Sequence, residues 1–170
     1  VETLETAERP VPGYLKALAL PADSTQLEAA AFAMYCFWTG EMELGAIEGV
    51  IATEAGWLEG HEVTKVTYRK DQITFPELVK AAEAVKCANK VYARTDAQLE
   101  SLGETRLQTG KLTADYRKAR ASDQKKQISG TAYGKLNLHP VQATKLNAWA
   151  RRDTATALSW LSPMQVDQLR

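Results

Sequence analysis

Two cysteines are the residues of this sequence best suited to covalent chemistry, and the surroundings of Cys36 are the more informative. An apolar run at residues 29–34 predicts a buried strand before it, and apolar residues within 38–47 predict a helix after it. Cys36 is therefore expected at a strand-to-helix turn, where unpaired N–H groups and the helix dipole favour negative charge. A thiol in this place is a candidate thiolate, which is the nucleophilic form. The alternative is that Cys36 and its neighbours Phe37 and Trp38 pack in the core, as free cysteines and aromatic residues usually do.

The second cysteine, Cys87, leaves two further readings open, because two cysteines can form one structural bridge or one redox pair. They are too few for a scaffold built on disulfides. The two histidines, His61 and His139, do not combine with them into a zinc-binding spacing. We therefore expect no metal site and no cofactor.

Composition narrows the class of protein. The 170 residues are 45% hydrophobic and 25% charged, which is typical of one globular domain with a sizeable core. Twenty-one basic and 21 acidic residues cancel, which argues against a nucleic-acid partner bound mainly through net positive charge. No run approaches the roughly 18 apolar residues of a membrane span, so no membrane partner is expected. The start at Val1 indicates a processed or trimmed form, compatible with a secreted, periplasmic or cytoplasmic protein.

The order of predicted elements indicates an α+β fold. Residues 1–25, with three of the six prolines, are expected as an extended N-terminal arm, and residues 26–170 as a single domain. Within that domain the patterns predict strands and helices in the order β-α-β-β-α-β, at residues 27–35, 37–47, 50–57, 62–68, 74–88 and 91–92. That order is the ferredoxin-like split βαβ arrangement, in which one sheet packs against two helices.

The remaining chain is expected to add C-terminal helices to this core. A short helix is predicted at 95–102, with Thr95 as its N-cap, and a polar helix-loop excursion at 104–121. A further helix is predicted at 140–151, and a last one begins after Ser162.

A family resemblance is carried by Cys36-Phe37-Trp38 followed by Glu41. These residues resemble the Gly-Cys-Phe-Trp-Gly-x-Glu signature of the A-type peptide methionine sulfoxide reductases. Weaker matches follow in the family's order: Gly49-Val50, Ala55-Gly56-Trp57, Gly60-His61-Glu62, Val66-Thr67-Tyr68, residues 73–78, Asp123 with Gln127, and residues 138–142. The resemblance covers residues 27–150.

Departures from the family pattern concern mainly the substrate pocket. Tyr35 and Thr39 replace two signature glycines, and Ile128 stands where the family has a substrate-binding tyrosine. A second such tyrosine has no counterpart, because the segment between Trp57 and Gly60 is short. Residues 89–122 resemble an insertion.

The resemblance implies a role for each candidate residue. Cys36 would attack the sulfoxide sulfur, while Glu62 would protonate the oxygen. Phe37 and Trp38 would form an apolar slot for the methyl group, and Asp123 would orient the oxygen or a water. The alternatives are that Glu62 is an ordinary solvated carboxylate and Asp123 an ordinary turn residue.

Catalysis of this kind leaves Cys36 as a sulfenic acid, which a second thiol converts to a disulfide. Cys87 is the internal candidate for that step, and a buried cysteine at a helix end is its alternative reading. If Cys87 cannot reach, a thioredoxin-like or small-thiol reductant must act directly. The expected function is thus thiol-dependent reduction of a methionine sulfoxide peptide or a small sulfoxide. A redox enzyme acting on peroxide or disulfide and a non-enzymatic binding protein are the alternatives.

Overall fold

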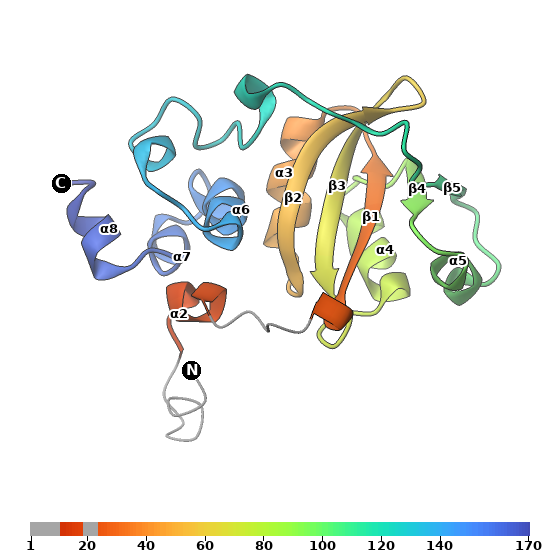
Figure 1. The fold of residues 1–170 in the computed structure, drawn as a ribbon, viewed down its shortest axis with the longest axis horizontal. Helices are drawn as coiled ribbons and strands as arrows, with labels where there is room; N and C mark the ends of the chain where they lie inside the picture. The colour runs from red at the N-terminus through yellow and green to blue at the C-terminus, as the bar shows by residue number, and fades with distance from the viewer. Residues whose placement is uncertain (1–10, 19–23) are drawn as a thin grey trace.

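The protein, described here by a computed structural model that covers residues 11–18 and 24–170, is built on one twisted sheet of six strands (Figure 1). The strands run in the spatial order β5-β4-β1-β3-β2-β6. They are β1 (Leu27–Ala33), β2 (Val50–Leu58), β3 (His61–Arg69), β4 (Lys90–Ala93), β5 (Gln108–Lys111) and β6 (Arg117–Lys118). The helices are α2 (Gly13–Leu18), α3 (Phe37–Ala46), α4 (Phe75–Ala84), α5 (Asp96–Leu102), α6 (Pro140–Trp149), α7 (Thr154–Leu158) and α8 (Pro163–Asp167).

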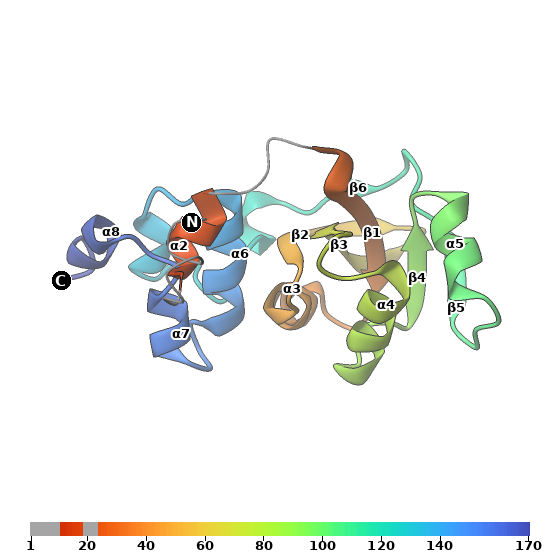
Figure 2. The ribbon, with the colours of Figure 1, turned by 90° about the horizontal axis from the view of Figure 1, so that it is seen from below.

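The predicted α+β fold is confirmed in its centre. The four inner strands β4, β1, β3 and β2 pair antiparallel, and α3 and α4 cover one face of them (Figure 2). This is the ferredoxin-like arrangement. Its main core joins Phe32 of β1 and Val66 of β3 with Leu44 of α3 and Leu78 of α4, all of them fully buried. Burial of these apolar faces is the main force that fixes α3, and therefore Cys36, at the end of β1.

The segment at 104–121 differs from the helix-loop excursion that its sequence predicted. It forms β5, which pairs parallel with β4, and β6, which pairs antiparallel with β2, so that it extends both edges of the sheet. Both strands are short and mostly polar, and they are held by backbone pairing rather than by an apolar face of their own. Strands held in this way need no alternation of apolar and polar residues, so the sequence pattern did not predict them.

Helix α4 is shorter than predicted. It ends at Ala84 because Lys86 takes a left-handed conformation, with a φ of 59°, and the Cys87 N–H donates to the Ala82 carbonyl at 2.8 Å. This is a helix-ending turn in which a lysine takes the place usually held by glycine. The turn directs Cys87 into the core.

The N-terminal arm was predicted as extended, but residues 13–18 form helix α2. The Tyr14 N–H donates to the Ser159 carbonyl at 3.2 Å, and Ala17 packs against Ile51 and Val141. Residues 1–10 and 19–23 of the proposed arm lie outside the described residues, so the domain boundary at 25 stays a prediction.

Helices α6, α7 and α8 form a second, smaller cluster, with α6 beside α3 and β2 (Figure 2). Lys145 of α6 joins the two parts, because its ammonium donates to the carbonyls of Gly45 and Ile47, at 2.8 and 2.9 Å, where α3 ends. Burial lowers the pKa of Lys145 to about 8, against the opposing effect of Glu48. Within residues 11–18 and 24–170, no helix has the length and apolar character to cross a membrane.

Candidate functional site

Cys36 occupies the N-cap of α3, as the sequence predicted. Its backbone is extended, with φ −143° and ψ 117°, and its carbonyl accepts the Gly40 N–H at 3.0 Å. The side chain is half-buried, while the preceding Tyr35 is 96% exposed. The thiol therefore lies at the positive end of a helix and within reach of solvent, as a nucleophilic cysteine requires.

The carboxyl group of Glu62 is held directly beside this turn. Its Oε2 accepts the backbone N–H of Phe37, the residue after Cys36, at 2.8 Å. Glu62 stands near the start of β3 and is half-buried. Its other oxygen forms no hydrogen bond with the described residues. The structure thus brings together Cys36 and Glu62, which are far apart in the sequence.

Aromatic rings border the pair. Phe37 is buried, and its ring centroid lies 6.3 Å from that of Trp38 and 5.4 Å from that of Trp57, the latter in edge-to-face geometry. The Lys126 ammonium sits 4.6 Å from the centroid of Trp38. In the described part of the chain, the Trp38 indole N–H is buried without a hydrogen-bond acceptor. The predicted slot residues Phe37 and Trp38 are thus in contact with each other, and their binding role stays a prediction. Trp57, which is 37% exposed, is a third aromatic ring beside Phe37 that sequence reasoning missed.

The position of Trp57 could have been found from the hairpin that joins β2 to β3. Glu59 and Gly60 both have positive φ, at 52° and 79°, as a two-residue turn requires. Such a turn fixes the register, so that Trp57 lies opposite Glu62. Directly opposed residues project from the same face of a sheet.

Asp123 lies in the short 3₁₀ turn at Ala121–Asp123 and is half-buried. Among the described residues, nothing forms a hydrogen bond or ion pair with its carboxylate. The structure therefore does not join Asp123 to Cys36 or Glu62, and its role stays a prediction.

The neighbouring Lys125, unlike Asp123, is bound to α3 through an ion pair with Glu41. Glu41 is fully buried, and it accepts the Lys125 backbone N–H at 2.6 Å and the Lys125 ammonium at 2.5 Å. The same ammonium donates to the Thr53 carbonyl of β2, and the Thr53 hydroxyl donates to Glu41 at 3.2 Å. This ion pair holds residues 124–127 against α3 and thereby places Lys126 on Trp38.

Replacing Lys125 with methionine is expected to destabilise the protein by about 3–5 kcal/mol, because the Glu41 carboxylate would remain buried without its cation. Chemical denaturation with fluorescence detection measures this directly. The control is Lys80→Met on the exposed face of α4, which should change stability by less than about 0.5 kcal/mol. Adding Glu41→Gln should recover much of the loss, and a Lys125→Met protein as stable as the parent would contradict this reading of the pair.

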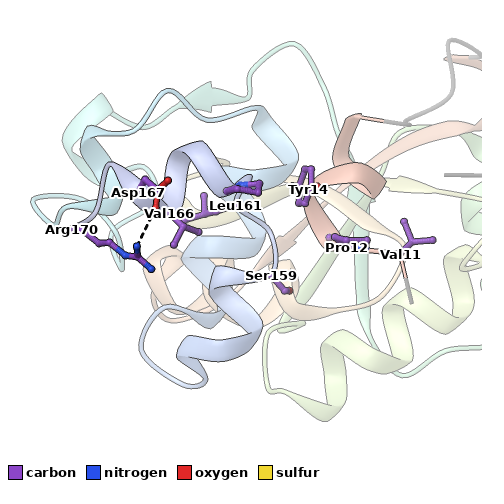
Figure 3. Close-up of a pocket in the computed structure, with 10 residues that line it drawn as sticks. Val11, Pro12, Tyr14, Ser159, Leu161, Val166, Asp167 and Arg170 are labelled. Carbon is purple, nitrogen blue, oxygen red and sulfur yellow. Dashed lines mark ion pairs between the residues drawn. The ribbon is translucent and has the colours of Figure 1, made fainter. Parts of the chain in front are cut away.

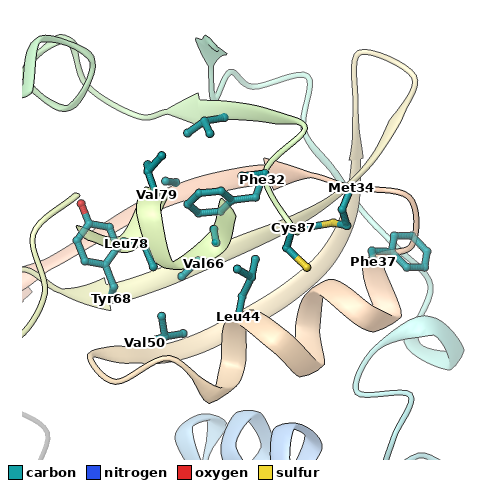
Figure 4. Close-up of a cluster of buried hydrophobic side chains, with 14 of the residues drawn as sticks. Phe32, Met34, Phe37, Leu44, Val50, Val66, Tyr68, Leu78, Val79 and Cys87 are labelled. Carbon is teal, nitrogen blue, oxygen red and sulfur yellow. The ribbon is translucent and has the colours of Figure 1, made fainter. Parts of the chain in front are cut away.

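Cys87 lies deep in the core. It is 1% exposed, and Figure 4 shows it beside Met34 and near Leu44. Burial, followed by the negative charge of Glu43, raises the pKa of its thiol to about 11 against a smaller opposing effect of Arg152. Cys36 and Cys87 are both free thiols, so the structure contains no bridge between them.

Two other cavities lie away from this site. One of about 430 Å³ is lined by Lys145, Trp149 and Trp160 near the end of α3. The other, of about 620 Å³, lies between residues 11–14 and the C-terminal residues around α8, and its charged members Asp167 and Arg170 pair with each other at 3.4 Å (Figure 3). Neither cavity is lined by Cys36 or Glu62. In the parts of the chain that the structure describes, no group of three His, Cys, Asp or Glu side chains is placed to hold a metal ion.

Comparison with known proteins supports one relationship. No family model matches the chain. It is 33% identical over 75 residues to the mitochondrial peptide methionine sulfoxide reductase of Mus musculus, covering 34% of this chain and 31% of that protein. It is 30% identical over 106 residues to the peptide methionine sulfoxide reductase MsrA of Pseudomonas syringae pv. tomato, covering 45% of this chain and 49% of that protein. The chain therefore spans half or less of the length of these relatives.

The fold agrees with that relationship. The structure of methionine sulfoxide reductase A of Corynebacterium diphtheriae superposes with a TM-score of 0.51 at 19% identity, covering 72% of this chain and 82% of that one. Over part of its length the chain is thus similar in sequence to peptide methionine sulfoxide reductases, and the similarity in structure concerns the fold.

Proposed function

We propose that the protein is a thiol-dependent reductase of methyl sulfoxides, acting on methionine (S)-sulfoxide in peptides or on a small sulfoxide. The observation that carries this proposal is the contact between Glu62 and the first N–H of α3, which holds a carboxyl group at the turn that carries Cys36. A nucleophile and a proton donor on one side of a bound sulfoxide are what its reduction requires. The relationship to peptide methionine sulfoxide reductases supports the same substrate class.

The reaction can be written with these two groups. The Cys36 thiolate forms a bond to the sulfoxide sulfur, while protonated Glu62 donates its proton to the sulfoxide oxygen. The oxygen passes to Cys36 as the sulfur–sulfur bond breaks, which releases the thioether and leaves a sulfenic acid on Cys36. Phe37 and Trp38 would enclose the methyl group, with Trp57 beside Phe37. Asp123 would orient the oxygen or a water.

Regeneration of the thiol is proposed to use an external reductant, of the thioredoxin-like or small-thiol class. One reductant thiol condenses with the sulfenic acid to form a disulfide and water, and a second thiol releases Cys36. The burial of Cys87 and the high pKa of its thiol argue against its being the first attacking group, because the thiolate is the reactive form.

Cys87→Ser is accordingly expected to retain sulfoxide reduction within about two-fold when a small dithiol is the reductant. It should instead lower the free energy of unfolding by about 1–3 kcal/mol, because a hydroxyl would be buried where no described residue forms a hydrogen bond with the Cys87 side chain. Steady-state kinetics and denaturation on the same preparation measure both effects. Cys87 would instead be the resolving cysteine if Cys87→Ser lost most of its turnover and the parent protein lost two thiols for each sulfoxide reduced.

The proposed function is tested by incubating the reduced protein with a racemic methionine sulfoxide peptide and a dithiol. Consumption of one sulfoxide epimer supports the proposal. Oxidation of the protein by hydrogen peroxide, without reduction of any sulfoxide, would favour a peroxide-reducing enzyme. That alternative is favoured by the buried Ile128, because it stands where the reductase family has a substrate-binding tyrosine. An unreactive Cys36 would leave a binding protein on the same fold.

A further inference from the structure

A row of three side chains crosses the sheet at the edge of the candidate site. Trp57 of β2 lies directly opposite Glu62 of β3 on one side and Arg117 of β6 on the other. Residues opposed in this way project from the same face. Glu62 and Trp57 both contact Phe37, so that face is the one bearing the Cys36 turn. Arg117 therefore extends the site outward by one strand.

The cavity beside this row is basic. Its volume is about 420 Å³, and it is lined by Trp57, Ala119 and three cations, Arg117, Lys118 and Arg120. Lys118 is paired with Glu54 at 2.9 Å, but within residues 11–18 and 24–170 no carboxylate pairs with Arg117 or Arg120. The chain as a whole carries no net charge, so this is a local excess of positive charge.

The position of the basic group is fixed by the fold. The Ala119 N–H donates to the Ala55 carbonyl at 2.9 Å, and the Gln124 amide accepts from the Ala55 N–H at 3.0 Å and donates to its carbonyl at 2.8 Å. The segment from Arg117 to Gln124 is thus held to the edge of β2 by backbone pairing before Arg120 and by the Gln124 side-chain amide after it. Arginine guanidiniums presented in this way match carboxylates in charge and geometry.

We infer that this cavity binds acidic residues that flank the methionine sulfoxide in a peptide substrate, with Trp57 packing against the peptide between them. The inference rests on the proposed function and narrows its substrate class to acidic peptide segments. Neighbouring strands are about 4.8 Å apart, so the backbones at Glu62 and Arg117 are separated by about 10 Å. An extended peptide covers that span in about three residues. The acidic side chains are therefore expected two or three positions from the oxidised methionine.

The test compares three substrates: a peptide with glutamates two and three positions from methionine sulfoxide, the same peptide with lysines there, and blocked single-residue methionine sulfoxide. Two exposed charge pairs predict a kcat/KM roughly three- to twenty-fold higher for the acidic peptide than for the basic one. The difference should lie mainly in KM and should shrink in 0.5 M salt, which screens exposed charges. The acidic and the basic peptide are each made in two versions, with the charged pair either before or after the methionine sulfoxide.

The double variant Arg117→Gln/Arg120→Gln is expected to remove the preference between the peptides. The control Arg106→Gln, an exposed arginine before β5 at the opposite edge of the sheet, should preserve it. Equal kcat/KM for the two peptides in the parent protein, or a preference that survives the double variant, would overturn the inference.

Binding separates this inference from the proposed function. If the protein reduces none of the three substrates, including the single residue, the proposed function fails. The dissociation constants of labelled acidic and basic peptides for Cys36→Ser protein, measured by fluorescence anisotropy, then decide the inference. Tighter binding of the acidic peptide that is lost with the two arginines supports it, and equal binding of both peptides contradicts it. An oligonucleotide that binds as tightly as the acidic peptide, through the same two arginines, would contradict the inference and indicate a nucleic-acid partner for the cavity.

Discussion

Cys36→Ser is expected to abolish sulfoxide reduction, lowering kcat/KM by at least about 10³-fold, because a serine hydroxyl at neutral pH is a far weaker nucleophile than a thiolate. The substitution removes little packing, since Cys36 is only half-buried at the N-cap of α3, and serine is itself a favoured N-cap residue. The loss should therefore come without a loss of stability. The measurement is the rate of sulfoxide consumption alongside the thermal midpoint of both proteins.

The matched control for that variant is Cys87→Ser, the same chemical change at the other cysteine. If both variants lost activity equally while remaining folded, the two thiols would act together. If neither did, Cys36 would not be the nucleophile and the proposed chemistry would be wrong.

Glu62→Gln is expected to lower kcat by roughly 10²- to 10⁴-fold while changing KM little, because the amide cannot donate a proton to the sulfoxide oxygen as a carboxylic acid does. The glutamine carbonyl can still accept the Phe37 N–H, so the turn around Cys36 should keep its geometry. A change confined to kcat would mark a group that acts in the transition state rather than in ground-state binding.

Glu59→Gln serves as the control for Glu62→Gln, because it removes an exposed carboxylate from the same hairpin. It should leave kcat within about two-fold of the parent. Retention of full activity by Glu62→Gln would show that the proton comes from another group, and Asp123 would be the next to replace.

The features that the sequence predicted correctly are those encoded locally. The apolar run before Cys36 and the apolar face after it are enough to place the cysteine at an N-cap. The N-cap predicted at Thr95 is confirmed in the same way, because its hydroxyl accepts the Gln98 N–H at the start of α5. Because these signals span only a few residues, the central β-α-β-β-α-β order could be derived without tertiary information.

The features that could not be predicted depend on residues distant in the sequence. Glu41 and Lys125 are joined only in the folded chain, and neither carries a local sign of burial. Strand β6 has two residues and is defined by its pairing with β2, so the placement of Arg117 beside Trp57 is invisible to periodicity. The burial of Cys87 follows from the left-handed turn at Lys86. Lysine rarely adopts this conformation, so the sequence gives no sign of the turn.

The proposed function depends on the transfer of an oxygen atom from a sulfoxide to Cys36. The direct measurement is mass spectrometry of the reduced protein after mixing with one equivalent of methionine sulfoxide peptide and a sulfenic-acid trap, with no reductant present. We expect stoichiometric reduction of the peptide and one trapped adduct on Cys36, with Cys87 unmodified. A peptide that remains oxidised while Cys36 stays a free, untrapped thiol would contradict it.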